Sequence, residues 1–259
     1  MRWKILALLT IASLSSLFSP PSVAQNLHIM TEQDPPYSFA GEDGKPTGYG
    51  VEVVEEIQRR LKTNDPISIR PWIRAYATIS RNPNVVVFTM SRTKEREPLF
   101  QWVGPIIEND WVIVGKKSSR LKIASLEDAK KLGKIGVVKD YAWDVYLTSQ
   151  GFHNLDRVPE YPANIRKAKV GRIQAFVSSN LSYQHELTEE MENPEDYEIL
   201  MKFNSVQMYI AHSKDTDKAI VDAWQSAFES MKNDGTLARL LARWIPPAKL
   251  PGPAKAASF

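Results

Sequence analysis

The sequence predicts an α/β protein built from largely parallel sheets. Short runs rich in β-branched residues alternate along the chain with segments whose apolar residues recur at helical spacing, and this alternation is typical of α/β layers. The fully apolar run at residues 85–88 follows the chain-breaking residues 82–84. Such a run is typical of a strand that is buried on both faces, as the strands of parallel sheets are.

The first half of the chain, after residue 24, contains three predicted strands and two predicted helices. A helix is expected from Tyr49 because Val53, Val54, Ile57 and Leu61 fall on one face and charged residues fall on the other. We expect strands at residues 27–30, 67–69 and 85–88, helices at residues 49–61 and 72–80, and irregular structure at residues 34–37, where two prolines restrict the backbone.

The second half repeats the alternation. Ser125, followed by Glu127 and Asp128, supplies the side-chain oxygen and the early acids that favour a helix start. We expect strands at residues 111–114, 135–138 and 206–211, helices at residues 125–132, 142–148 and 217–232, a further α/β repeat across residues 165–191, and a loose tail at residues 246–259.

The first 24 residues have the layout of a secretory signal peptide. A basic start at residues 1–4 precedes an apolar run at residues 5–18, and small residues lead up to Ala24. A membrane anchor is the alternative, but the run of 14 residues is shorter than the ~20 that a helix needs to cross a bilayer. We therefore expect cleavage after Ala24 and a location in the periplasm.

Charge and cysteine content exclude several classes of protein. Without residues 1–24 the chain carries 31 basic and 30 acidic residues, a balance that favours neither nucleic acid nor an acidic membrane surface as a partner. The absence of cysteine excludes disulfides, a thiol nucleophile, cysteine-ligated metal and a lipid-modified cysteine. We expect no membrane anchor, no metal and no other cofactor.

The residues after the buried strand at 85–88 carry a resemblance to a known family. The segment at residues 90–96, Met-Ser-Arg-Thr-Lys-Glu-Arg, resembles the signature of the periplasmic solute-binding proteins of ABC importers, family 3, the polar amino acid-binding type. Other segments occur in that family's order along nearly the whole mature chain, at residues 35–39, 44–49, 137–139, 171–175 and 234–236.

The resemblance implies a two-lobe, type II periplasmic-binding-protein fold, in which two hinge strands join mostly parallel sheets flanked by helices. Lobe 1 would comprise residues 25–108 and 207–259, and lobe 2 would comprise residues 109–206, with crossings near residues 106–110 and 203–207. The lobes would close over a ligand. The protein is expected to be a monomer that delivers its solute to an inner-membrane ABC permease.

Arg96 is the first candidate for ligand binding. In the resembling family the arginine at this motif position binds the ligand carboxylate, and a guanidinium can hold a carboxylate through two parallel hydrogen bonds. Ser91 matches a hydroxyl donor to the same group. The alternative is that Arg96 pairs with Glu95 or Glu97 on a solvated helix start.

Two aromatic residues, Trp72 and Tyr37, are candidates for the lobe 1 wall of the cleft, because aromatic faces give a large contact area at a small entropy cost. Tyr76 and Arg74, near Trp72 in the sequence, are weaker candidates. Packing in the core is the alternative for each aromatic residue.

In lobe 2, residues 139–143 lie where a strand leads into a helix, so backbone N–H groups near Ala142 could complete the carboxylate site. Members of the resembling family commonly carry glycine near Asp140, and this chain does not. The side chains of Tyr141 and Trp143 are then alternative contacts for the ligand.

Ser179 is the most informative departure from the family pattern. An aspartate at this position accepts the ligand's α-ammonium group in amino acid receptors of the family, and a neutral hydroxyl cannot supply that charge. Either another acid, such as Asp34 or Asp140, replaces it, or the solute is not an α-amino acid.

The leading hypothesis is an extracytoplasmic protein that captures a small carboxylate-bearing solute, amino acid-like or not, for an ABC importer. A periplasmic enzyme is the first alternative, because the same fold hosts a cyclohexadienyl dehydratase; Glu32, Asp34, Lys139 and Asp140 would then transfer protons. A soluble sensor that acts in trans on a membrane receptor is the second. We expect a binding protein rather than an enzyme.

Overall fold

The computed structural model describes residues 26–245. The predicted signal peptide, its cleavage after Ala24 and the predicted tail at residues 246–259 lie outside the described residues. Within residues 26–245, no helix combines the length and the apolar character that a membrane crossing requires.

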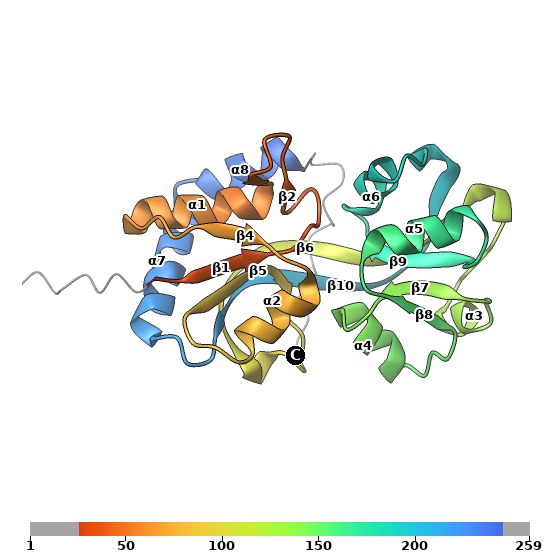
Figure 1. Ribbon diagram of the computed structural model, residues 1–259, viewed down its shortest axis with the longest axis horizontal. Helices are drawn as coiled ribbons and strands as arrows, with labels where there is room; N and C mark the ends of the chain where they lie inside the picture. Colours follow the sequence, from red (N-terminus) through yellow and green to blue (C-terminus); the bar gives the residue numbers. More distant parts are fainter. Residues whose placement is uncertain (1–25, 246–259) are drawn as a thin grey trace, which may run out of the picture.

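Two α/β lobes share one eight-stranded sheet, whose strand order is β4-β1-β5-β10-β6-β9-β7-β8 (Figure 1). Three strands belong to lobe 1: β1 (His28–Thr31), β4 (Ile67–Ile69) and β5 (Val85–Ser91). Three belong to lobe 2: β7 (Ile135–Val138), β8 (Leu155–Val158) and β9 (Ala175–Ser179). Each set of three pairs in parallel, as the apolar runs predict.

The two lobes are joined by β6 (Phe100–Lys116) and β10 (Tyr197–Ser213), each of 17 residues. They pair antiparallel along their whole length, and β10 also pairs antiparallel with β5, as β6 does with β9. The predicted strands at residues 111–114 and 206–211 were therefore too short. Polar residues such as Glu108 and Asn204 interrupt the apolar pattern, because these strands leave the core where they cross between the lobes.

Four helices flank the lobe 1 sheet. Three of them, α1 (Tyr49–Leu61), α7 (Lys218–Asn233) and α8 (Thr236–Trp244), share one hydrophobic cluster. The fourth, α2 (Trp72–Ile79), packs against β5 in a different cluster. The helix α8 and a short hairpin of β2 (Phe39–Ala40) and β3 (Pro46–Thr47) were not predicted.

Lobe 2 contains α3 (Leu126–Lys130), α4 (Ala142–Ser149), α5 (Tyr161–Lys169) and α6 (Tyr183–Glu189). Ser125 caps α3 as expected, because its hydroxyl accepts a hydrogen bond of 3.2 Å from the backbone N–H of Asp128. Short 3₁₀ turns occur at Glu97–Leu99, Lys117–Ser119 and Pro194–Asp196. The strand β8 was not predicted.

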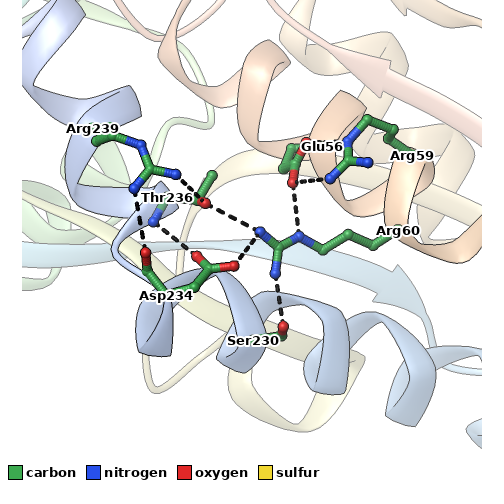
Figure 2. Close-up of polar contacts among 7 residues, drawn as sticks. All are labelled: Glu56, Arg59, Arg60, Ser230, Asp234, Thr236 and Arg239. Carbon is green, nitrogen blue, oxygen red and sulfur yellow. Dashed lines mark hydrogen bonds and ion pairs between the residues drawn. The ribbon is translucent and has the colours of Figure 1, made fainter.

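A polar network joins α1 to the turn between α7 and α8 (Figure 2). Arg60 donates to Glu56 at 2.8 Å and to Asp234 at 2.7 Å. Asp234 in turn accepts a hydrogen bond of 2.9 Å from the backbone N–H of Thr236 at the start of α8, after Gly235 with φ of 75°. The segment at residues 234–236, part of the family resemblance, therefore has a structural role.

Candidate functional site

Side chains from both lobes meet around a small cavity of about 30 Å³, next to the carboxyl ends of β1 and β5. Ligands of α/β proteins bind at such strand ends. Seven of the nine predicted site residues line the cavity. Its lining consists of Glu32, Asp34, Trp72, Thr89, Met90, Ser91, Arg96, Asn109, Tyr141, Ala142, Trp143 and Met208.

Arg96 has a buried guanidinium, with 7% of the residue exposed. The group lies over the ring of Trp72, 4.7 Å from its centroid, and 5.2 Å from the centroid of Tyr76. It donates to the carbonyl of Ser91 at 3.3 Å and forms none of the ion pairs found within residues 26–245. Burial lowers the pKa of Arg96. Glu32 and Glu95 attract the guanidinium without a direct ion pair. Burying a cation is costly unless it is paired, and a ligand carboxylate would supply a direct partner.

The acids next to Arg96 have other partners. Glu97 accepts a bidentate pair of hydrogen bonds from Arg92, one of them at 2.6 Å. Thr93 donates to the side chain of Glu95 and lowers its pKa. The local pairing considered as the alternative for Arg96 is thus made by Arg92 instead.

Thr89 also lines the cavity, at a backbone position that the sequence does not reveal. It has φ of 58°, a conformation that is rare for a β-branched residue and costs roughly 1–3 kcal/mol. Its methyl group would lie 2.5 Å from a Cβ added to Gly50, so glycine at the start of α1 makes room for it. Backbone strain often marks functional sites, but no sequence pattern predicts this conformation of Thr89.

Trp72 and Tyr141 connect the two lobes across the cavity. Their ring centroids are 5.6 Å apart, and Trp72 Nε1 donates to the carbonyl of Asp140 at 3.3 Å. The Tyr141 hydroxyl donates to the carboxylate of Glu32. Asp140 has φ of 63°, a region that glycine adopts freely and that aspartate is one of the other residues to tolerate.

Ala142 and Trp143 form the first turn of α4 and are buried. The carboxylate of Asp144 accepts a hydrogen bond of 3.0 Å from the backbone N–H of Asp140 and pairs with Arg157 at 2.9 Å. The carboxylate of Asp144 is thus an anion of this chain at the start of α4. The cavity is lined here by Tyr141 and Trp143 rather than by glycine.

Tyr37 and Ser179, the two other predicted site residues, do not line the cavity. Tyr37 is fully buried in the lobe 1 core, and its hydroxyl accepts a hydrogen bond of 3.2 Å from the amide of Asn109. The Ser179 hydroxyl accepts a hydrogen bond of 3.0 Å from the backbone N–H of Ser182 before α6. Both residues support the wall from behind.

Asp34 lies beside Ser179. Its carboxylate accepts a hydrogen bond of 2.7 Å from the Ser182 hydroxyl, which is 3.0 Å from the Ser179 hydroxyl. Burial raises the pKa of Asp34 to about 7, against the opposing effect of the Ser182 hydrogen bond. Of the two acids considered as replacements for the missing aspartate, Asp34 therefore lies next to the position.

Besides Thr89, three polar residues of the site were absent from the predicted set. Glu32 was considered only for the enzyme alternative, and Asn109 and Glu186 were not considered. Asn109 is buried and its side-chain oxygen has no partner in the described part of the chain. Glu186 is buried in α6 and accepts a hydrogen bond of 2.9 Å from Ser178. Polar neighbours such as Gln184 make α6 resemble a solvated helix, so the sequence hides this acid.

Comparison with solved structures identifies the type of fold. Solved structures of type II periplasmic binding proteins share the fold: an ancestral arginine-binding protein bound to arginine has a TM-score of 0.75 at 23% identity, covering 85% of this chain and 97% of its own. A histidine kinase sensor domain similar to periplasmic binding proteins has a TM-score of 0.79 at 18% identity, covering 86% and 96%.

A family model for bacterial extracellular solute-binding proteins, family 3, matches residues 27–247, and the chain belongs to this family. The L-cystine-binding protein TcyJ of Escherichia coli strain K12 is 24% identical over 82% of this chain and 79% of its own length. The arginine-binding periplasmic protein of Mannheimia haemolytica is 21% identical over 86% and 92%. Members of the family are solute-binding proteins.

Among the described residues, no group of His, Asp and Glu side chains could hold a metal ion.

Proposed function

We propose that this protein captures a small carboxylate-bearing solute between its lobes, with the carboxylate held by Arg96, and delivers it to an inner-membrane ABC importer. The observation that carries the proposal is the buried guanidinium of Arg96, which lines the cavity and forms none of the direct ion pairs found among residues 26–245, although Glu32 and Glu95 attract it at longer range. Ser91, at the end of β5, lies on the same cavity wall and supplies a hydroxyl donor to the carboxylate.

The same cavity offers acceptors for an ammonium group. The Asp34 carboxylate and the side-chain oxygen of Asn109, which has no partner among residues 26–245, both belong to residues of its lining. The relatives named above are described as binding cystine and arginine, which are amino acids. We therefore propose an amino acid-like solute whose ammonium is accepted by Asp34, in place of the aspartate that Ser179 replaces.

In this structure two hydrogen bonds join the lobes, one from Tyr141 to Glu32 and one from Ser182 to Asp34. We propose that these hydrogen bonds form when the lobes close. We propose that the hinge lies where β6 and β10 cross, near residues 106–110 and 203–207, which makes residues 25–108 with 207–259 one lobe and residues 109–206 the other. We also propose that the mature chain starts at residue 25 and that it is a monomer in the periplasm.

The test is a melting assay of residues 25–259 with amino acids, organic acids and small peptides, because a ligand that binds only the native state stabilises it by RT ln(1 + [L]/Kd). Arg96→Ala should abolish the shift caused by the best compound. Arg92→Ala is the matched control, since it removes a nearby guanidinium that pairs with Glu97. An unchanged shift in Arg96→Ala would show that the carboxylate binds elsewhere.

Two further measurements separate the alternatives. Mass spectrometry of the bound compound after prolonged incubation should recover it intact, whereas a converted product would favour the periplasmic enzyme. Uptake of the compound by cells that lack the protein should fall if it serves an importer. Normal uptake with a lost transcriptional response would favour a sensor that acts in trans.

A further inference from the structure

Four acids lie close together where the two lobes meet, and we call them the interlobe acids: Glu32, Asp34, Glu186 and Glu189. The first two follow β1 in lobe 1, and the other two lie on α6 in lobe 2. Repulsion acts across the contact, because the charge of Glu186 acts on Glu32. The charge of Glu189 likewise acts on Asp34. Contact between the lobes therefore brings like charges together.

Few cations balance the interlobe acids. The guanidinium of Arg96 attracts Glu32. Arg70 is exposed, and it lines the interlobe cavity of about 250 Å³ to which three of the four acids belong. None of the four forms an ion pair within residues 26–245. The other titratable groups around them supply no positive charge: Glu160, Glu190, Tyr37, Tyr141 and Tyr161.

Burial makes the charged form of these acids unfavourable. Asp34 and Glu186 are 7% and 4% exposed, and Glu32 is partly buried. Burial raises the pKa of Asp34 to about 7 and the pKa of Glu32 and of Glu186 well above the ordinary value. The protonated form is therefore the stable one while the lobes are in contact.

An acceptor without a donor lies in the same region. Asn109 is 2% exposed and lines the small cavity together with Glu32 and Asp34. Its amide nitrogen donates to Tyr37 at 3.2 Å, and its side-chain oxygen has no partner among the described residues. A carboxylate cannot donate a hydrogen bond, whereas a protonated carboxyl can. The unpartnered oxygen of Asn109 thus favours a neutral acid beside it.

Separation of the lobes would reverse this preference for the protonated form. The contacts that cover the acids cross between the lobes, since Tyr141 donates to Glu32 and Ser182 donates to Asp34 at 2.7 Å. Once these contacts break, water solvates the carboxyl groups and their pKa values return towards the ordinary range. The lobes in contact therefore hold protons that the separated lobes release.

We propose that proton uptake by the interlobe acids closes the lobes of the solute-free protein at acidic pH, and that their ionisation opens the lobes at alkaline pH. In the absence of solute, a proton on Asp34 takes the place of the ammonium group proposed to bind there. This inference goes beyond the proposed function, because it needs no solute. The protein would then respond to acidity as well as to its solute.

The test measures lobe separation by single-molecule energy transfer in the solute-free protein, which is unfolded in urea and refolded to remove any bound compound. Because the chain contains no cysteine, Glu42→Cys and Met191→Cys introduce a single pair of dye sites. Both positions are exposed, one between β2 and β3 in lobe 1 and the other after α6 in lobe 2. The pair Lys122→Cys and Met191→Cys, both exposed in lobe 2, is the control and should not respond to pH.

The closed population should predominate at pH 5 and decline towards pH 9. The ratio of closed to open molecules should fall up to about tenfold per pH unit for each proton released, between the ordinary and the raised pKa of each acid. The triple variant Glu32→Gln, Asp34→Asn and Glu186→Gln is permanently neutral and should remain closed at pH 9. Glu190→Gln is the matched control, because Glu190 pairs with Arg166 at 2.9 Å, and it should keep the wild-type profile.

Asp34→Asn alone keeps the proposal testable if the triple variant does not fold. It removes one proton, so the closed-to-open ratio should depend less steeply on pH below pH 7. A wild-type ratio that stays constant from pH 5 to pH 9 overturns the proposal, and so does a pH dependence that Asp34→Asn leaves unaltered. Neither result bears on Arg96, because solute binding in the melting assay is measured separately.

Discussion

The carboxylate of Asp34 and the hydroxyl of Ser182 form a hydrogen bond of 2.7 Å that joins the segment after β1 to the start of α6. Its neighbours make similar contacts: Tyr141 donates to Glu32, and Gln33 donates to Glu189 at 3.3 Å. The segment at residues 32–34 of lobe 1 therefore holds lobe 2 through three successive side chains. Two of these three are acids, which makes the contact between the lobes sensitive to protons.

The first prediction concerns Asp34 and pH. Burial raises the pKa of Asp34 from 3.8 to about 7. An acid with a raised pKa in the folded state contributes stability that is fully present below its unfolded pKa and lost as pH rises through the folded value. The protein should therefore be more stable at pH 5 than at pH 8, by up to about 2.6 kcal/mol from this group.

Urea unfolding at a series of pH values measures this effect. Asp34→Asn keeps an acceptor for Ser182 but cannot ionise, so it should flatten the profile between pH 4 and pH 7. Asp196→Asn, at an exposed position outside the cavity, is the control. A profile with the same slope in Asp34→Asn and in the wild type would show that this carboxyl is not the source.

The second prediction concerns the indole of Trp72, which donates to the carbonyl of Asp140 and covers Arg96. Trp72→Phe should keep most of the ring contact and lose the hydrogen bond, at a cost of about 1 kcal/mol. Trp72→Ala should cost about 3–5 kcal/mol and weaken ligand binding as well. Both values are measured by urea unfolding.

A tryptophan without such a bond provides the control for Trp72. Trp244 Nε1 has no partner among residues 26–245, so Trp244→Phe should cost less than Trp72→Phe. Equal losses in the two phenylalanine variants would argue against a stabilising contact between the Trp72 indole and the backbone of lobe 2.

The sequence predicted those parts of the site that depend on residue type and local order. The motif at residues 90–96 indicated Arg96, hydrophobic periodicity located α1 and α7, and apolar β-branched runs located the parallel strands other than β8. The positive φ of Thr89 was not predictable, because it depends on tertiary packing against Gly50. Glu186 was missed for a related reason, since only the fold shows that α6 turns this acid inward while its neighbour Glu189 stays exposed.

The third prediction concerns Gly50 in the first turn of α1. A Cβ added there would lie 2.5 Å from the Thr89 methyl group and 3.2 Å from the ring of Phe88. Gly50→Ala should displace the end of β5, lower stability by about 1–3 kcal/mol and weaken ligand binding, because Ser91 and Arg96 follow directly. Calorimetric titration and urea unfolding check the two effects.

Gly41 serves as the control for Gly50. The nearest atoms to its added Cβ lie at 3.4 Å, an ordinary contact distance, so Gly41→Ala should leave binding unchanged. If Gly50→Ala bound the same ligand with an unaltered dissociation constant, the shape of the β5 end would not control the site.

The last prediction restores the family's aspartate at position 179. In this chain Ser179 is buried, and Ser182 links it to Asp34 through contacts of 3.0 Å and 2.7 Å. A carboxylate at position 179 would lie beside that of Asp34, and two buried like charges disfavour each other. Ser179→Asp alone should therefore destabilise the protein, and adding Asp34→Asn should recover stability, with a coupling energy of about 1–3 kcal/mol in the double-mutant cycle. Additive effects of the two substitutions would mean that positions 34 and 179 do not share one site for the ammonium group.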